Sequence, residues 1–288
     1  MSKKRGFSVR IFIPEGDPEG LRLIEKFNWN GQGVVFPRTQ FLEARKRPEL
    51  QRAGVYVLWG PDDSSHLPRL YIGEGDVVAH RLEQHYRQKE FWTHAAVFTS
   101  KDENLNKAHV QYLEARLIQM ASQARRALLD NANNPQRPSL SEPDQADAEA
   151  FLADMLLCLP LVGANFFEAA KKEDAKSPVL FLRAKGIEAR GFESTEGFVV
   201  LKGSQAVREE VPSIGSSLKE LRRTLLEQKV LQEEADVLIL TQNYAFSSPS
   251  AAAGVLLGRS ANGRIEWKDE RGRTLKELQE SAINEKQP

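Results

Sequence analysis

The sequence predicts a mixed α+β protein with two domains. Segments in which apolar and polar residues alternate, as in strands, are interspersed with segments whose apolar residues recur at helical spacing. A chain of 288 residues exceeds the usual size of one domain, and residues 171–178 form a polar, charged stretch that is typical of a linker. We therefore expect one domain before this stretch and a second after it.

Residues 1–53 are expected to be an N-terminal extension of the first domain. The expected elements are a strand at 8–13, a helix at 18–26, a strand at 33–36 and a helix at 38–47. The extension either adds strands to the sheet of the first domain or forms a lid over it, and the sequence leaves both arrangements open.

The next segment, residues 54–140, begins with a predicted β-hairpin. Its first strand runs from Gly54 to Trp59 and its second begins at Arg69, with turn-forming residues between them that predict an enlarged loop. Because side chains alternate along a strand, Tyr56 points away from its two neighbours. Tyr71 stands beside Tyr56 if the two share a face.

A helix at 76–90, a strand at 95–99 and a long helix at 105–130 follow the hairpin. Arg81 and His85 are one turn apart on the first helix, so both face the end of the sheet. Glu114 lies within the apolar face of the long helix. A carboxylate there is costly to bury unless it meets a cation or a hydrogen-bond donor, which makes Glu114 a candidate functional residue.

These residues resemble the GIY-YIG nuclease superfamily. Gly54-Val55-Tyr56 matches the first motif with Val in place of Ile, Tyr71-Ile72-Gly73 matches the second, Arg81 and His85 match the helix pair, and Glu114 matches the metal-binding glutamate. Asn131, Asn133 and Asn134 compete for the late asparagine of the family, and we favour Asn131. The resemblance covers residues 54–135. It implies a three-stranded antiparallel sheet flanked by helices. This sequence departs from compact members of the family in the longer loop between the two motifs.

The resemblance also implies a metal-dependent endonuclease with Tyr56, Tyr71, Arg81, His85 and Asn131 as catalytic residues. Tyr56 would be the general base, His85 would help to remove its proton, and Tyr71 would orient the water or the phosphate. Arg81 would offer a planar fork of donors to the phosphate, and Glu114 would hold one Mg²⁺ or Mn²⁺ ion. The expected partner is nucleic acid, with DNA favoured over RNA, in restriction, phage defence or repair in a bacterium.

Two alternatives stay open: a catalytically silent nucleic-acid-binding module, and an RNA-directed nuclease. Strand tyrosines usually pack in the core, and Arg81 with Glu114 would also suit a buried ion pair. The intact set of Tyr56, Arg81 and Glu114 favours an enzyme. Recognition of a 2′-hydroxyl leaves no short motif here, and the sequence does not indicate an oligomeric state.

Charge and composition set further limits. The net charge is 0, yet residues 1–137 carry 21 Lys and Arg against 16 Asp and Glu, which favours local phosphate contact. The basic cluster Arg45, Lys46, Arg47 and Arg52 either touches a nucleic-acid backbone or is a solvated helix end. No apolar run is long enough to span a bilayer, and the start of the chain lacks the apolar segment of a signal peptide, so we expect a cytoplasmic protein that binds no membrane. The single Cys158 excludes an intrachain disulfide, and 5 histidines without a cysteine cluster argue against structural zinc.

Residues 141–176 are expected to be a helical connector and linker, and residues 177–280 a second small α+β domain. Its expected elements are strands at 179–183, 189–192, 198–202 and 237–241, helices at 217–228 and 249–257, and a last hairpin at Asn262-Gly263. The stretch from Phe246 to Ala253, with Asn262-Gly263 and Trp267, resembles a domain of unknown function that often follows GIY-YIG modules. It resembles more distantly the small domains attached to restriction and adenine-methylation enzymes. The resemblance implies an accessory, nucleic-acid-docking role.

Overall fold

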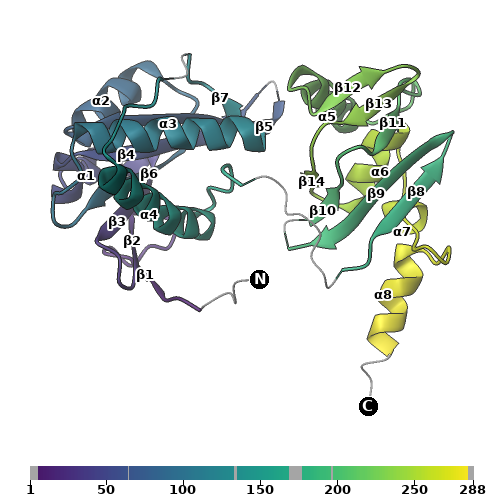
Figure 1. Ribbon diagram of the computed structural model, residues 1–288, viewed down its shortest axis with the longest axis horizontal. Helices are drawn as coiled ribbons and strands as arrows, with labels where there is room; N and C mark the ends of the chain where they lie inside the picture. The colour runs from purple at the N-terminus through teal and green to yellow at the C-terminus, as the bar shows by residue number, and fades with distance from the viewer. Residues whose placement is uncertain (1–5, 64, 133–134, 169–176, 196, 285–288) are drawn as a thin grey trace. The chain divides into compact units, whose positions relative to one another are not determined.

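The computed structural model describes residues 6–63, 65–132, 135–168, 177–195 and 197–284 (Figure 1). The chain divides into two compact units, whose described residues fall within 1–63 and 67–168 for the first and within 64–66 and 169–288 for the second. Both units combine helices and strands, which confirms the α+β fold class. No described helix is long and apolar enough to cross a membrane.

A seven-stranded sheet with the order β1-β2-β3-β6-β4-β5-β7 forms the centre of the first unit. Its strands are β1 (Val9–Phe12), β2 (Arg22–Lys26), β3 (Gly31–Pro37), β4 (Gly54–Asp62), β5 (Ser65–Gly75), β6 (His94–Ser100) and β7 (Leu128–Leu129). The three predicted strands of the hairpin segment are therefore part of a larger sheet. The extension joins it through β3, which pairs antiparallel with β6 along its whole length. Of the two arrangements left open for the extension, the structure shows the added strands.

Helices cover both faces of this sheet. One face carries η1 (Arg38–Gln40), α1 (Phe41–Ala44), η2 (Pro48–Gln51) and α2 (Val78–Gln88), and the other carries α3 (Lys107–Ala124), α4 (Glu142–Cys158) and η3 (Leu159–Val162). Figure 1 shows α3 and α4, which contact each other, beside the sheet. Because side chains alternate, Val55 and Val57 of β4 pack in the α3 core and Tyr56 packs in the α2 core. The two motif strands therefore present Tyr56 to α2.

Several expectations for the first unit are wrong. The helix expected at 18–26 is replaced by β2, because Ile24 pairs with Ile11 on one side and Gly33 on the other, and this pairing overrides the local pattern. The enlarged hairpin loop is also wrong, since β4 continues to Asp62 and β5 begins at Ser65. Gly60 belongs to the turn-like stretch between the two predicted strands, but it lies within β4. A Cβ there would lie 2.1 Å from the Phe91 carbonyl oxygen. The helix expected at 38–47 is reduced to η1 and the four-residue α1.

The second unit contains a four-stranded sheet with the order β14-β10-β9-β8 and a three-stranded antiparallel sheet with the order β11-β13-β12. The strands are β8 (Leu180–Ala184), β9 (Ile187–Ser194), β10 (Gly197–Val200), β11 (Gln205–Val207), β12 (Leu231–Glu234), β13 (Val237–Leu240) and β14 (Tyr244–Phe246), and the helices are α5 (Ser216–Glu227), α6 (Pro249–Leu257), α7 (Gly263–Glu266) and α8 (Leu275–Asn284). Phe246 and Trp267 are buried core residues, so neither offers a base-stacking surface.

The hairpin expected at Asn262-Gly263 is wrong. Asn262 caps α7 instead, because its side-chain oxygen accepts a hydrogen bond from the Arg264 backbone N–H at 3.1 Å. A Cβ on Gly263 would lie 2.1 Å from the carbonyl carbon of Pro249, so the glycine permits a close approach of the start of α6. Asn262-Gly263 therefore serves to cap α7 and to allow close packing, and it does not form a hairpin turn.

Candidate active site

Tyr56 and His85 form a buried pair between β4 and α2. Tyr56 is fully buried and His85 is 6% exposed, and the Tyr56 hydroxyl lies 2.8 Å from His85 Nε2. The other ring nitrogen of His85, Nδ1, is buried without a hydrogen-bond partner among the described residues. The only polar contact of the imidazole in this part of the chain is therefore the phenol predicted to be the base.

Gly73 makes room for the Tyr56 ring. A Cβ at position 73 would lie 2.3 Å from Tyr56 Oη and 2.4 Å from its Cζ, which no side chain can tolerate. Gly73, the last residue of the second motif, therefore has to lack a side chain because the phenol ring of Tyr56 lies over β5 at this position. This close approach fixes the hydroxyl against His85.

Tyr71 completes the ring cluster. Its ring centroid lies 6.3 Å from that of Tyr56 and 4.5 Å from that of His85. Lys89, the C-cap of α2, places its Nζ 4.7 Å from the centroid of the Tyr71 ring, and the same ammonium group lies 2.5 Å from a carboxylate oxygen of Asp130. Sequence reasoning gave Lys89 and Asp130 no role, although Lys89 shares a helix stripe with His85 and Asp130 directly precedes Asn131.

Asn131 is placed to position the second motif. Its amide nitrogen donates to the Ile72 carbonyl at 2.7 Å, and its amide oxygen accepts from the Ile72 N–H at 3.0 Å. The side chain therefore imitates a paired strand beside β5 and holds the backbone between Tyr71 and Gly73. Asn133 and Asn134, the competing asparagines, lie outside the described residues.

Arg81 and Glu114 lie on different helices and form no ion pair in the described part of the chain. Arg81 is exposed near the start of α2 and donates to the Gln84 side chain at 3.1 Å. Glu114 is half-buried on α3 and makes no hydrogen bond or ion pair with any described residue. Lys107, two turns earlier on α3, pairs instead with Glu74 at 2.9 Å. The buried Arg81–Glu114 ion pair considered from the sequence is thus not observed.

The positive charge of Arg81 shifts the pKa values of four groups of the site: Tyr56, Tyr71, His85 and Glu114. Burial raises the pKa of Tyr56 well above its ordinary value, with a contribution from Tyr71, and burial likewise raises the pKa of Tyr71. The Arg81 cation opposes both of these shifts. Burial, followed by the cations Lys89 and Arg81, lowers the pKa of His85 to about 4. Tyr56 and His85 are therefore both neutral at pH 7 when no ligand is present.

Glu114 is the residue that fits a metal ion. Burial and then the charge of Glu74 raise its pKa to about 7, and Arg81 and Lys107 oppose this shift. Among the described residues no group of three or more His, Cys, Asp or Glu side chains is arranged to hold a metal. A single, half-buried carboxylate without a partner suits Mg²⁺ or Mn²⁺ of the kind that takes its other ligands from water and phosphate. The residues present therefore fit a one-carboxylate site.

Glu114→Gln is expected to stabilise the metal-free protein at alkaline pH. Because the folded state holds the Glu114 proton up to a pKa of about 7, the free energy of unfolding falls as the pH rises from 4.5 to 7. Gln cannot ionise, so we expect a gain of about 1–2 kcal/mol at pH 8, after discounting the shift for solvent screening, and no gain at pH 4. Urea unfolding in EDTA at both pH values measures the difference.

Glu149→Gln is the matched control, with the opposite sign. A hydrogen bond from Arg116 lowers the pKa of Glu149, so its ionised form stabilises the folded state and its loss is expected to destabilise at pH 8. If wild type and Glu114→Gln unfold at the same urea concentration at pH 8, the raised pKa of Glu114 is wrong.

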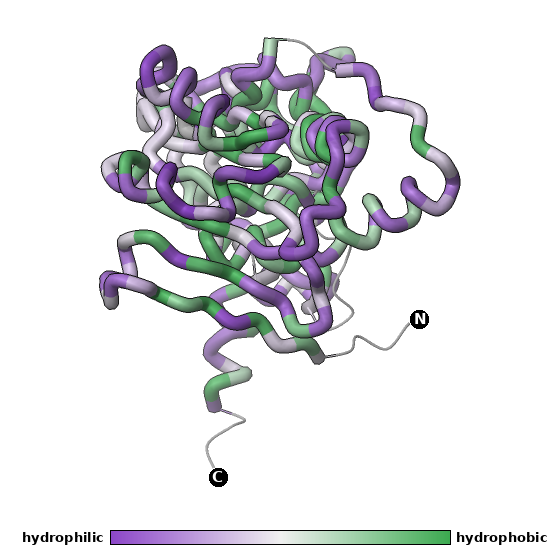
Figure 2. Tube along the Cα trace, turned by 90° about the vertical axis from the view of Figure 1, so that its left-hand side faces the viewer, coloured by the Kyte–Doolittle hydropathy of each residue, from purple (hydrophilic) through white to green (hydrophobic). Residues whose placement is uncertain are grey.

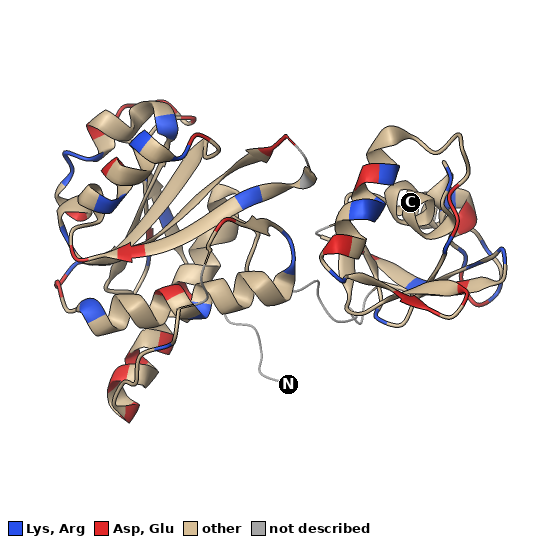
Figure 3. Cartoon of the chain, turned by 90° about the horizontal axis from the view of Figure 1, so that it is seen from above, with Lys and Arg blue, Asp and Glu red and all other residues tan. Residues whose placement is uncertain are grey.

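The basic cluster before the first motif is neutralised within the protein. Its members pair with acidic side chains at 2.9–3.5 Å: Arg45 with Glu83, Lys46 with Glu43, Arg47 with Glu49 and Arg52 with Glu103. In the view of Figure 3, basic and acidic residues are interspersed on the first unit. The ion pairs agree better with a solvated helix end than with a surface that contacts a nucleic-acid backbone.

Comparison with known protein families finds a match in the second unit. A family described as a domain of unknown function (DUF4357) matches residues 180–279, within the second unit. This supports the resemblance of the C-terminal part to a domain of unknown function, and no family match supports the nuclease resemblance of residues 54–135. No curated protein and no solved structure matches the chain.

Proposed function

We propose that the first unit is a metal-dependent endonuclease of the GIY-YIG type that hydrolyses phosphodiester bonds of DNA. The observation that supports this most is the Tyr56–His85 hydrogen bond across Gly73, with the charge of Arg81 reaching both residues and Glu114. These groups comprise a hydroxyl–imidazole pair, an exposed guanidinium and a carboxylate that makes no hydrogen bond or ion pair with another described residue. Phosphodiester hydrolysis needs a proton acceptor and stabilisation of negative charge, and the site offers groups for both.

Tyr56 and His85 would accept the proton of the attacking water together. As the water oxygen bonds to phosphorus, its proton passes to Tyr56 Oη while the hydroxyl proton of Tyr56 passes to His85 Nε2 across 2.8 Å. In the free site this transfer is unfavourable, because burial raises the pKa of Tyr56 and lowers that of His85. A bound phosphate adds negative charge, which raises the pKa of the imidazole. The substrate would therefore help to activate the base that attacks it.

Arg81 would stabilise the charge that develops on the phosphate as its bond to the leaving oxygen breaks. Its guanidinium is exposed, donates to Gln84 and hydrogen-bonds Tyr56, and a planar fork of several donors can also meet phosphate oxygens. An Mg²⁺ or Mn²⁺ ion held by Glu114 would supply Lewis-acid stabilisation of the same oxygens when bound. We assign the second unit an accessory role in docking nucleic acid, from its resemblance alone.

The test is cleavage of labelled single-stranded and duplex DNA and RNA at pH 8, where Glu114 is ionised, with Mg²⁺ or Mn²⁺. We expect DNA to be cut, and EDTA or Glu114→Gln to stop the cutting. Because Glu114→Gln is expected to be the more stable protein at this pH, its inactivity would not reflect unfolding. Glu142→Gln, an exposed carboxylate on α4, is the control that should still cut.

The other outcomes each contradict part of the proposal. Binding of DNA without cutting under every metal would favour a silent recognition module. Cutting of RNA alone would favour an RNA-directed nuclease. Cutting that survives both EDTA and Glu114→Gln would refute the metal requirement.

A further inference from the structure

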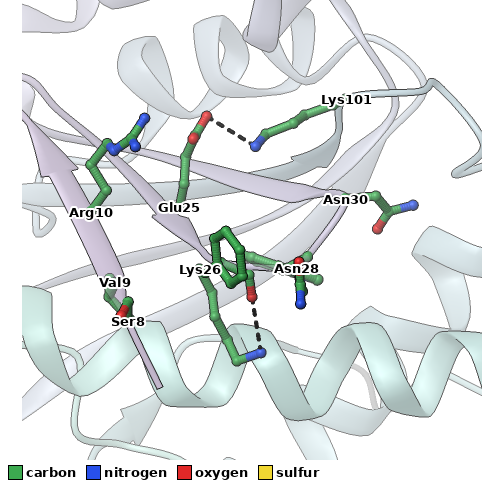
Figure 4. A pocket seen from close by; sticks show the side chains of 10 residues that line it. Ser8, Val9, Arg10, Glu25, Lys26, Asn28, Asn30 and Lys101 are labelled. Carbon is green, nitrogen blue, oxygen red and sulfur yellow. Dashed lines mark hydrogen bonds and ion pairs between the residues drawn. The ribbon is translucent and has the colours of Figure 1, made fainter. Parts of the chain in front are cut away.

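A pocket of about 700 Å³ opens beside the β1–β2 hairpin, away from the proposed catalytic residues. Its lining includes Arg10 of β1, Glu25 of β2, Phe27 and Asn28 after β2, and Lys101 after β6. Figure 4 shows Arg10 and Lys101 on either side of Glu25. We propose that this pocket binds an unpaired nucleotide of a single-stranded DNA segment next to the cut, which rests on the proposed function.

Phe27 supplies a surface for a base. Its side chain is 72% exposed, although a phenylalanine ring normally gains from burial, and it lies between two polar residues at the end of β2. Figure 2 shows apolar positions, in green, alternating with polar ones along the β1–β2 ribbon next to the N-terminal trace. An exposed aromatic ring beside cations is the combination that holds single-stranded nucleic acid by stacking. A base paired in a duplex cannot use it.

Arg10 and Lys101 supply the phosphate contacts. Arg10 makes no hydrogen bond or ion pair with the described residues. Lys101 pairs with Glu25 at 3.2 Å, but both side chains are more than one-third exposed, so this pair contributes little and can be exchanged for a phosphate. Asn28 adopts a left-handed backbone with φ of 58° and its amide has no partner among the described residues. The pocket thus combines a ring, two cations and an open amide.

The pocket lies at the end of the strands where β4 and α2 begin, the two elements that carry Tyr56 and His85. The Lys101 N–H donates to the Asn30 carbonyl at 2.8 Å, and Arg52 donates to the Lys101 carbonyl at 3.2 Å. The Arg52 carbonyl in turn accepts from the N–H of Val78, the first residue of α2, at 3.2 Å. Three strand-to-strand spacings separate β2 from β4, which makes a distance of about 14 Å. A single DNA strand with stacked bases covers this distance with about four nucleotides. One strand can therefore reach both places.

Binding of a fluorescent oligo(dT) to the full chain in EDTA tests this site without cleavage. Phe27→Ala is expected to weaken oligo(dT) binding about tenfold and to leave duplex binding nearly unchanged. Arg10→Gln is expected to lower the slope of log affinity against log salt by about 0.7, the loss of one phosphate contact on a single strand. The matched control for Phe27→Ala is Ile11→Ala, an exposed apolar residue of the neighbouring β1, and the control for Arg10→Gln is Lys46→Gln, an exposed lysine of the same unit.

The inference is overturned if Phe27→Ala binds oligo(dT) as Ile11→Ala does. It is also overturned if light scattering shows a dimer that Phe27→Ala dissociates, because a second copy would then cover the pocket. Tighter binding of oligo(rU) than of oligo(dT) would refute DNA as the ligand. A chain that binds oligo(dT) through Phe27 but never cuts in the separate cleavage assay would refute the proposed nuclease and leave this site standing.

Discussion

An Arg81→Ala variant is expected to cut DNA about 10²–10³-fold more slowly than wild type while it keeps its stability. The rate falls because the guanidinium is the group placed to stabilise charge on the phosphate. The fold is expected to survive because Arg81 is exposed and its hydrogen bond to Gln84 lies within the same helix, one turn along. A surface substitution of this kind usually changes stability by less than about 0.5 kcal/mol. Single-turnover cleavage and urea unfolding measure the two effects separately.

Arg87→Ala is the matched control for this experiment. Arg87 is exposed on the same helix and pairs with Glu83, so its loss removes a cation of α2 without touching the site. Arg81→Lys separates charge from geometry, since lysine keeps the cation but loses the planar fork, and we expect it to recover only part of the rate. An Arg81→Ala protein as active as Arg87→Ala would remove Arg81 from the mechanism.

Gly73→Ala is expected to lose cleavage and to lower the melting temperature. The added Cβ would meet Tyr56 Oη at 2.3 Å and Cζ at 2.4 Å, and the ring is fully buried, so it can move only by displacing packed neighbours. Overpacking of this kind costs about 1–3 kcal/mol. Displacement of the ring also breaks the hydrogen bond to His85, so the chemical step is lost even in the fraction of molecules that stays folded. Thermal unfolding followed by circular dichroism, and cleavage well below the transition, are the measurements.

Gly33→Ala distinguishes a damaged site from a merely weakened protein. A Cβ at Gly33 would lie 2.5 Å from a methyl carbon of Ile24 and 2.8 Å from the Phe98 ring, a comparable clash in the core of the other face of the sheet. We expect it to destabilise the unit and still cut at low temperature. If Gly73→Ala retains the wild-type rate and melting temperature, the Tyr56 ring does not depend on the space above Gly73.

The parts of the candidate site that are local in sequence were the predictable ones. Tyr56, Arg81 and His85 lie on a strand and a helix whose periodicity is clear, and the structure brings Tyr56 and His85 into contact. Long-range contributions were not visible. The Lys89–Asp130 pair joins residues that are 41 positions apart, and the short β7 is a strand only because it pairs with β5. No local sequence pattern predicts such contacts.

Glycine was the residue most easily misread. Gly60 and Gly263 both lie in polar, turn-like sequence, and both indicated a reversal of the chain. In each case another backbone segment approaches the position where a Cβ would be: the connection before β6 at Gly60, and the start of α6 at Gly263. A single sequence does not separate a glycine chosen for its backbone angles from one chosen for its lack of a side chain. The fold class was predictable because it depends on many residues, whereas these two sites each depend on one.

The position of β6 between β3 and β4 has a consequence for synthesis of the chain. Residues 94–100 pair with β3 on one side and with β4 on the other, so neither ladder can form until this segment has left the ribosome. Until then the nascent chain carries two apolar strands with open edges, the kind of surface that associates with other chains. Non-local pairing of this kind also slows folding. The first 62 residues therefore depend on a segment made after them, and the time needed to translate residues 63–100 contributes to how long those edges stay unpaired.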